Sequence, residues 1–241
     1  MTDTINFILW VVFPWAMMAS FVGGIIWVFA TKNWTVTAKS SEVLEKKQLM
    51  WGSIFLHVGI LGELAGHIQG MLIPESFMTA IGNGPKQFEM IANIGGAVFG
   101  TIIFIGILIL TYRRFTNARV FFTSSWTDIV VDVALLVIIV FGMMSSFIAS
   151  PLHLGGANFD YRQVIGVWAR SLFSFNVQWR PMIDVYWIYK AHMIAAFALM
   201  GFFPYTRLMH ALTIPMQYIF RRLIVYRTKK DSAAEKALDK K

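Results

Sequence analysis

The feature that most constrains this chain is a series of long apolar stretches. Five windows are hydrophobic enough to be membrane spans: residues 5–30, 51–73, 91–112, 128–149 and 183–205. A helix of about 20 apolar residues crosses the hydrocarbon core of a bilayer. Charged residues make up only 14% of the chain, against about 25% in a typical soluble domain. The sequence therefore predicts an all-α integral membrane protein with five transmembrane helices.

The distribution of basic residues predicts the orientation of these helices. Lysines and arginines gather after the first window (Lys32, Lys39, Lys46, Lys47), after the third (Arg113, Arg114, Arg119) and near the end of the chain (Arg221, Arg222, Arg227, Lys229, Lys230). Because cytoplasmic segments collect Lys and Arg, we expect these segments and the C-terminus in the cytoplasm and the N-terminus outside. The net charge of +8 then reflects membrane topology, and no nucleic acid partner is predicted.

One five-helix transmembrane domain is predicted over residues 1–226, followed by a charged cytoplasmic tail over 227–241. Asp3 and the lack of a basic start or a small-residue cleavage site favour a mature first helix over a signal peptide. The chain has no cysteine. This excludes disulfides, thiolate metal sites and covalent c-type haem attachment.

The segment 161–175 is predicted to lie outside the membrane. It places Ile165, Trp168 and Leu172 at helical spacing. This pattern predicts an amphipathic helix at the interface, or else a loop with a chance arrangement of apolar residues.

Four of the five histidines fall on two of the predicted spans. His57 and His67 end the stretch HVGILGELAGH in the second window, and His192 and His210 belong to the fifth if that helix runs past residue 205. Ionisable side chains are costly in a bilayer, so each of the four is a candidate functional residue with a partner to be named. His153, between the fourth and fifth windows, is predicted to be a surface residue.

Helix geometry pairs these histidines across two antiparallel helices. The step from His57 to His67 rises about 15 Å, and that from His192 to His210 about 27 Å on one continuous helix. His57 then lies level with His210 at the inner face, and His67 with His192 at the outer face. Each pair offers two imidazoles to one haem iron, and a kink at Pro204 would reduce the mismatch in spacing. A histidine proton relay without haem is the alternative. One metal ion shared by all four is disfavoured, because the two levels lie too far apart.

Glycines form a stripe along the same helix, at Gly59, Gly62, Gly66 and Gly70. Their spacing leaves a thin surface that either a flat macrocycle or a neighbouring helix can approach closely.

Most of the chain resembles the membrane cytochrome b (gamma) subunit of respiratory nitrate reductase. The resemblance is carried by WTVTAKSSEVLEKKQLMWGSIFLHVGILGELAGHIQGMLIP, LTYRRFTNARV, FDYRQVIGVWARSLF and KAHMIAAFALMGFFPYTRLMHALTIPMQYIFRR. These blocks occur in the order expected for the family. PYTRLMH followed by TIP is the most specific of them.

This resemblance implies two b-type haems with bis-histidine ligation. His57 and His210 are the expected ligands of the inner haem, and His67 and His192 those of the outer haem. A membrane quinol, menaquinol or ubiquinol, is expected to be oxidised at the outer haem. Electrons then pass to a cytoplasmic iron–sulfur (beta) subunit and on to a molybdenum catalytic (alpha) subunit that reduces nitrate. The implied location is the bacterial cytoplasmic membrane, which the chain crosses several times.

Further site residues follow from the same resemblance. Lys86 is expected in the quinol pocket, with a solvated loop lysine as the alternative. Arg113 and Arg207 are candidates to pair with haem propionates, since guanidinium groups bind carboxylates bidentately; anchoring at the cytoplasmic face is their alternative.

The chain departs from the family pattern at Glu63 and Gln69, where apolar residues are usual. Glu63 lies one helical turn before His67, so we hypothesise that it accepts a proton released by quinol oxidation. A packing role, paired with a neighbouring polar group, is the alternative. Two other functions also stay open: a haem-b quinone oxidoreductase anchor of another respiratory complex, and a transporter whose histidines relay protons.

Overall fold

The computed structural model describes residues 2–31, 41–152, 154 and 159–212. Within these ranges every regular element is helical, which confirms the all-α class. The chain divides into two units, residues 1–209 and 210–241, and only the first three residues of the second unit are described. His153, the predicted domain boundary after residue 226 and the tail 227–241 lie outside the described residues.

Four of the predicted spans are confirmed as long apolar helices in the described part of the chain. They run over Thr2–Thr31, Lys47–Leu72, Pro85–Thr116 and Trp126–Ala149. The first comprises α1 (Thr2–Phe7), a π-helical stretch (Ile8–Val12) and α2 (Phe13–Thr31); the second α3 (Lys47–His67) and a π-helical stretch (Ile68–Leu72); the third α5 (Pro85–Thr116); the fourth α7 (Trp126–Met144) and a π-helical stretch (Ser145–Ala149). Each is long enough to cross a bilayer.

The fifth predicted span forms a shorter helix, α9, over Trp187–Phe202. Its 16 residues fall below the roughly 20 that a straight crossing needs. Two 3₁₀ turns follow, Phe203–Tyr205 and Arg207–Leu212. Pro204 lies in the first of them, where its ring and its missing N–H prevent the α-helix from continuing. The continuous helix assumed for the 27 Å step is therefore wrong.

Short helices connect the long ones. They are α4 (Glu75–Ala80), α6 (Ala118–Thr123), α8 (Tyr161–Ser171) and 3₁₀ turns at Leu172–Ser174 and Arg180–Ile183. The side chain of Asp160 caps α8 by accepting the N–H of Arg162 at 2.9 Å. Ile165 and Trp168 on α8, and Leu172 just after it, are buried. The amphipathic helix predicted for this segment is confirmed, and the loop alternative is wrong.

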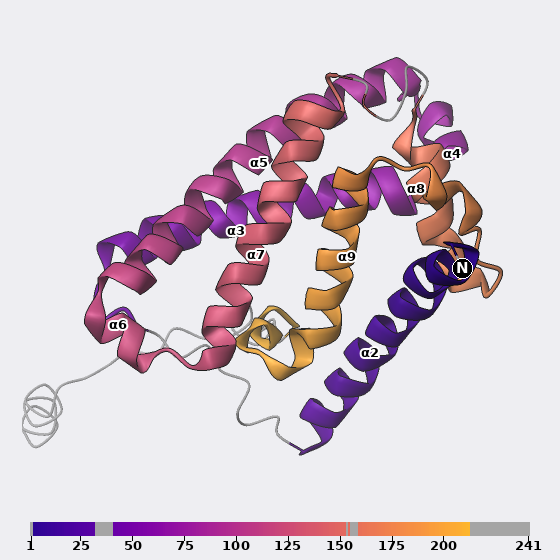
Figure 1. The fold of residues 1–241 in the computed structure, drawn as a ribbon. Helices are drawn as coiled ribbons and strands as arrows, with labels where there is room; N and C mark the ends of the chain where they lie inside the picture. Colours follow the sequence, from indigo (N-terminus) through magenta and orange to yellow (C-terminus); the bar gives the residue numbers. More distant parts are fainter. Residues whose placement is uncertain (1, 32–40, 153, 155–158, 213–241) are drawn as a thin grey trace, which may run out of the picture. The chain divides into compact units, whose positions relative to one another are not determined.

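The long helices are neighbours in the order α3, α5, α7, α9 and α2. Figure 1 shows α7 between α5 and α9. Glycines allow α3 and α5 to approach closely: a Cβ atom at Gly59 would lie 2.5 Å from Cβ of Ile103, and one at Gly106 only 2.4 Å from the backbone nitrogen of Leu56. This pairing aligns α3 and α5 antiparallel, and small residues at such contacts are typical of membrane helices.

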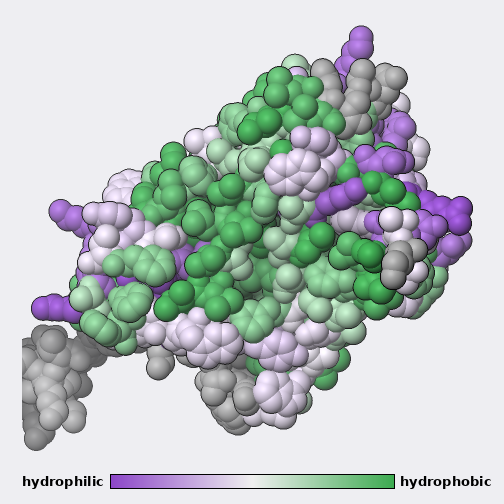
Figure 2. Space-filling model, viewed as in Figure 1, coloured by the Kyte–Doolittle hydropathy of each residue, from purple (hydrophilic) through white to green (hydrophobic). Residues whose placement is uncertain are grey.

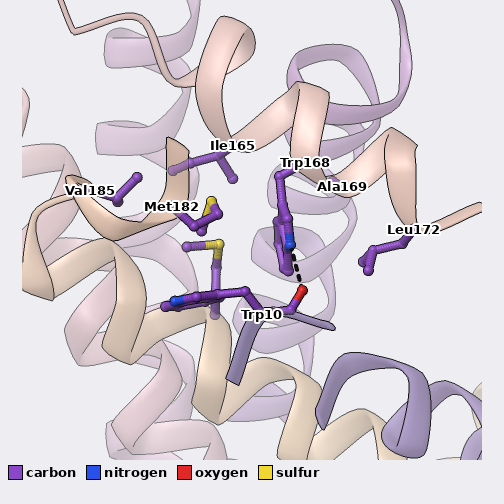
Figure 3. Packing of buried hydrophobic residues seen from close by; sticks show 8 residues of the cluster. Trp10, Ile165, Trp168, Ala169, Leu172, Met182 and Val185 are labelled. Atoms are coloured by element: carbon purple, nitrogen blue, oxygen red, sulfur yellow. Dashed lines mark hydrogen bonds between the residues drawn. The ribbon is translucent and has the colours of Figure 1, made fainter. Parts of the chain in front are cut away.

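A second packed core joins the start of the chain to α8 and the turns after it. The indole rings of Trp10 and Trp168 meet edge to face with centroids 5.7 Å apart, and Trp168 Nε1 donates to the carbonyl of Trp10 at 2.8 Å. Figure 3 shows these two rings with Met182 and Ile165 around them. This core places α8 against the end of α3, where the π-helical stretch 68–72 lies.

The surface of the long helices is mostly apolar. Figure 2 shows hydrophobic side chains over the middle of this face and hydrophilic ones toward its edges. Large hydrophobic side chains such as Ile26, Leu61 and Ile94 are more than half exposed. A soluble protein seldom exposes so continuous an apolar surface, whereas lipid solvates it.

Candidate functional site

The structure brings together His67 and His192, which were predicted from the sequence to lie at the same depth, near the outer face of the membrane. His67 ends α3 and His192 lies in the second turn of α9. Their imidazole rings have centroids 6.0 Å apart with 27° between the ring planes. Metal–imidazole bonds are about 2 Å long, so this separation leaves room for one metal ion between the rings.

The Nδ1 atoms of three histidines are held by backbone carbonyls. His67 Nδ1 lies 2.7 Å from the carbonyl oxygen of Glu63, and His57 Nδ1 lies 2.7 Å from that of Ser53, in each case one turn earlier on α3. His192 Nδ1 lies 2.9 Å from the carbonyl oxygen of Ile138 on α7. A carbonyl that accepts from Nδ1 fixes the tautomer in which Nε2 carries a lone pair, as in metal-ligating histidines.

His57 and His67 lie on one uninterrupted α-helix, so their separation along its axis is the predicted rise of about 15 Å. The expected partner of His57 is His210, an exposed residue in the 3₁₀ turn Arg207–Leu212. His210 is the first residue of the second unit of the chain. The pairing of His57 with His210 stays a prediction.

The glycine stripe on α3 serves two purposes. Cβ atoms at Gly59, Gly62 and Gly70 would lie within 3 Å of Ile103, Phe99 and Tyr161 respectively, so these three glycines allow close packing within the protein. At Gly66, next to His67, an added Cβ would meet no atom within 4 Å. Of the four, only Gly66 leaves open space beside the histidine pair.

A further glycine makes room for His192. A Cβ atom at Gly142 of α7 would lie 3.1 Å from Cε1 of that imidazole. This residue was not predicted from the sequence, because only the crossing of α7 and α9 places it against the ring. Its signal in the sequence, one glycine in an apolar helix, is weak.

His67, His192 and Gly66 fit a haem that is ligated by two histidines. Two imidazoles approach each other with Nδ1 of each held by a carbonyl, and Gly66 leaves space beside one of them. Among the described residues, no group of three or more His, Cys, Asp or Glu side chains gathers as a metal ion bound only by protein would require. A two-ligand cofactor therefore suits the donor set better than a bare ion.

Glu63 lies beside this pair. Its Oε2 is 4.0 Å from Nδ1 of His67, and its side chain is 28% exposed. Its Oε1 and the sulfur of Met143 are each 3.4 Å from the position of a Cβ on Gly100. The carboxylate thus lies against α5 at Gly100, a position that Met143 of α7 also approaches.

Lys86 lies farther from the histidine pair than Glu63 does. It is exposed in the first turn of α5. The contacts of Gly59 with Ile103 and of Gly62 with Phe99 set the register of the antiparallel pair. This register places Lys86 about 13 Å along the helix axis beyond the level of His67, toward α4.

The two arginines considered for propionates have carboxylate partners in the protein. Arg113 is buried and donates from Nε to Glu45 at 2.8 Å and from NH2 to the carbonyls of Ser41 and Glu45 at 2.9 Å each. Arg207 Nε lies 3.2 Å from Oδ1 of Asp128. Both guanidinium groups are thus engaged by carboxylates of the protein itself, and their pairing with haem propionates stays a prediction.

Two buried carboxylates on α7 were missed by the sequence analysis. Asp128 pairs with Arg207 and also accepts the N–H of Ser125 at 2.9 Å, which caps α7. Asp132 accepts from Arg114 at 3.1 Å and from Thr111 at 3.0 Å. The sequence contains a pattern that could have revealed them, namely two aspartates one helical turn apart at the start of an apolar span.

This fold defines an all-helical membrane protein, with a histidine pair joining two of its helices. The sequence model of the nitrate reductase gamma subunit family matches residues 6–229 of this chain. The nitrate reductase gamma chain of Bacillus subtilis is 35% identical over 220 residues, 91% of this chain and 97% of that protein. The respiratory nitrate reductase 2 gamma chain of Escherichia coli is 29% identical over 95% of this chain and the whole of that protein. The nitrate reductase-like protein NarX of Mycobacterium tuberculosis is 30% identical over 95% of this chain but only 35% of its own length.

The chain belongs to the nitrate reductase gamma subunit family. It is therefore a membrane subunit of a nitrate reductase, an oxidoreductase.

Proposed function

We propose that this chain is a dihaem cytochrome b subunit that oxidises quinol near the outer face of the bacterial cytoplasmic membrane. Electrons leave it at the inner face for a cytoplasmic iron–sulfur (beta) subunit, and a molybdenum-containing (alpha) subunit reduces nitrate. Five crossings are proposed, with α9 as the short fifth, the N-terminus outside and the C-terminus in the cytoplasm. The lysines and arginines of the first and third linkers support this orientation.

The observation that carries the proposal is the pairing of His67 with His192. Their rings lie 6.0 Å apart, and a backbone carbonyl holds Nδ1 of each. A proton relay without haem has no need for both Nδ1 atoms to be fixed, because a relay passes protons through both ring nitrogens. Axial ligation needs this arrangement, because each Nε2 must present its lone pair.

The chain's own residues divide into two sites. His67 and His192 would hold the outer haem, with Gly66 leaving space for the macrocycle; His57 and His210 would hold the inner one. When bound, the two haems supply one-electron redox chemistry at two levels of the membrane. Arg113 and Arg207 help to fix the chain around the inner level through Glu45 and Asp128.

Quinol oxidation also releases protons, and Glu63 is the proposed acceptor. Its carboxylate is the acidic group nearest to His67 among the described residues, with Oε2 4.0 Å from Nδ1. Lys86 is proposed to contact the quinol headgroup. Because the register places it about 13 Å beyond His67 along the axis, that headgroup would lie between the two residues.

The decisive experiment is a haem count on the purified complex. We expect two b-type haems per chain, from the pyridine haemochrome and the reduced-minus-oxidised spectrum. His67→Tyr should remove the outer haem and quinol oxidation and leave the inner haem in place. A chain without haem would favour the proton-relay transporter instead, and loss of both haems in His67→Tyr would contradict the assignment of ligands to levels.

A further inference from the structure

The helix α8 lies against the end of the span that carries His67. The π-helical stretch Ile68–Leu72 follows His67 directly and packs against α8. The N–H of Ile73 closes this stretch by donating to the carbonyl of Ile68 at 3.1 Å. π-Helical turns appear mostly as single insertions in longer helices, frequently at functional sites. The segment that ends the second span is therefore a candidate to control how His67 is presented.

The last carbonyls of this stretch need partners from outside the helix. The final turn of a helix leaves its carbonyl groups without intrahelical donors, and Pro74, which follows soon after, has no N–H to donate. Arg170 of α8 supplies one donor, because its NH1 group lies 2.8 Å from the carbonyl oxygen of Met71. Its positive charge also lies at the carbonyl end of the helix, where the helix dipole favours a cation. Arg170 thus caps the helix that carries His67.

Two glycines allow the arginine to reach this carbonyl. Gly166 precedes Arg170 by one helical turn and lies on the same face of α8. A Cβ atom at Gly166 would lie 3.1 Å from NH1 of Arg170 and 3.2 Å from the carbonyl oxygen of Gly70. A Cβ atom at Gly70 would in turn lie 2.8 Å from the hydroxyl oxygen of Tyr161, the first residue of α8. One glycine on each element therefore lets α8 lie close against the π-helical stretch.

The capped carbonyl lies about one helical turn from the proposed haem ligand. Met71 follows His67 by four residues, a rise of about 6 Å, so a shift of the π-helical stretch is transmitted to the peptide that carries His67. The partner ring of His192 is held separately, by the carbonyl of Ile138 on α7. A rotation of the end of α3 therefore changes the 27° angle between the two imidazole planes.

We propose that Arg170 is a positioning residue for the outer haem. By capping the carbonyl of Met71 it fixes the π-helical stretch and, through it, the orientation of the His67 imidazole. The inference rests on the proposed function, since it requires His67 to be a ligand of the outer haem. Groups that orient an axial ligand also tune the metal that it binds. The angle between two axial imidazoles affects the g values of a low-spin ferric haem, so EPR spectroscopy reports it.

The test combines EPR spectroscopy and hydrogen–deuterium exchange on the intact complex. In Arg170→Gln the shorter amide does not reach the Met71 carbonyl, so we expect both haems to be retained, with shifted g values and midpoint potential for the outer haem alone. Exchange in the peptide 68–73 should be about tenfold faster, the effect expected for the loss of one hydrogen bond from a charged donor. Arg170→Lys retains a cationic donor and should keep most of the wild-type signature.

A second variant acts on the same contact without removing the charge. Gly166→Ala places a methyl group against NH1 of Arg170 and the carbonyl of Gly70, and alanine is well accepted in a helix. We expect a smaller shift of the same outer-haem signal, and this variant decides the test if Arg170→Gln does not assemble. Arg180→Gln is the matched control, because it removes an equal charge from an exposed position after α8. It should leave the spectrum and the exchange unchanged.

Three results have distinct meanings. Faster exchange in Arg170→Gln with an outer-haem spectrum equal to that of the wild type would overturn the inference and leave Arg170 as a helix cap alone. Equal spectral shifts in Arg170→Gln and Arg180→Gln would also overturn it, because they would indicate a general effect of charge. A wild-type complex without haem would contradict the proposed function itself, whereas two normal haems with an unchanged signature contradict only the role of Arg170.

Discussion

The imidazole rings of His67 and His192 lie 6.0 Å apart, although they come from helices far apart in the sequence. Neither ring is free to turn, because Nδ1 of His67 is held by a carbonyl of its own helix and Nδ1 of His192 by a carbonyl of α7. Three helices therefore determine one pair of ligands. The position of α7 is then as important for the site as the two histidines themselves.

Gly142 tests this dependence on α7. In Gly142→Ala the new methyl group would lie 3.1 Å from Cε1 of His192, so the ring must shift by a few tenths of an ångström. We expect both haems to be retained, with a changed midpoint potential and EPR signature for the outer haem. Gly23→Ala, at an exposed position of α2, is the control, since its methyl group would meet no atom within 4 Å. Equal spectra for Gly142→Ala and the wild type would show that α7 does not position His192.

Gly59 and Gly66 should separate helix packing from cofactor binding. In Gly59→Ala the added Cβ would lie 2.5 Å from Cβ of Ile103, and overpacking of this kind costs about 1–3 kcal/mol of unfolding free energy. In Gly66→Leu the added Cβ would meet no atom within 4 Å and the longer side chain would extend into the space proposed for the macrocycle, so we expect stability to be kept and the outer haem to be lost. The measurements are thermal unfolding in detergent and the haem count. A stable Gly66→Leu variant that binds two haems would disprove the role of Gly66.

Glu63→Gln tests the proposed proton acceptor. The amide keeps the shape of the side chain and the backbone carbonyl that holds His67, but it cannot take up a proton. We expect a lower quinol oxidation rate and a changed pH profile, with both haems and their spectra intact. A rate and a pH profile equal to those of the wild type would remove the role and leave Glu63 as a packing residue.

Asp128→Asn should destabilise the chain more than loss of a surface ion pair. Asp128 is 7% exposed and Arg207 37% exposed. Breaking a fully buried pair costs about 3–5 kcal/mol, and partial solvation of the arginine reduces this to about 1–3 kcal/mol. Glu42→Gln removes the exposed pair with Lys46 and should cost no more than about 1 kcal/mol. Equal shifts of the unfolding midpoint would contradict this ranking.

We expect the Glu45 carboxylate to make a pH-dependent contribution to the free energy of unfolding. The N–H of Gln48, and with it the guanidinium of Arg113, lower the pKa of Glu45 below its ordinary value. A lowered folded pKa means that the ionised carboxylate stabilises the fold above its unfolded pKa, and that this contribution disappears as the pH falls through the folded pKa. The difference in unfolding free energy between wild type and Glu45→Gln should therefore be largest near neutral pH and shrink under acid conditions. A difference independent of pH would show that the carboxylate acts through its shape alone.

The sequence alone determined the features that depend on local pattern. Runs of apolar residues fixed four long helices to within a few residues at most ends, and the spacing of Ile165 and Trp168 predicted the buried face of α8. These predictions succeed because hydrophobic length and helical periodicity are properties of a short segment, whatever packs against it. The placement of His57 and His67 on one helix follows for the same reason.

The tertiary structure decided which side chains meet. It ended α9 before Pro204, so the spacing expected for His192 and His210 on one helix does not hold. It assigned Gly59 to packing and left Gly66 open, although the two are alike in sequence. It also gave Arg113 a carboxylate partner within the protein. These outcomes depend on helix crossings and registers between distant segments, and no single stretch of the sequence contains that information.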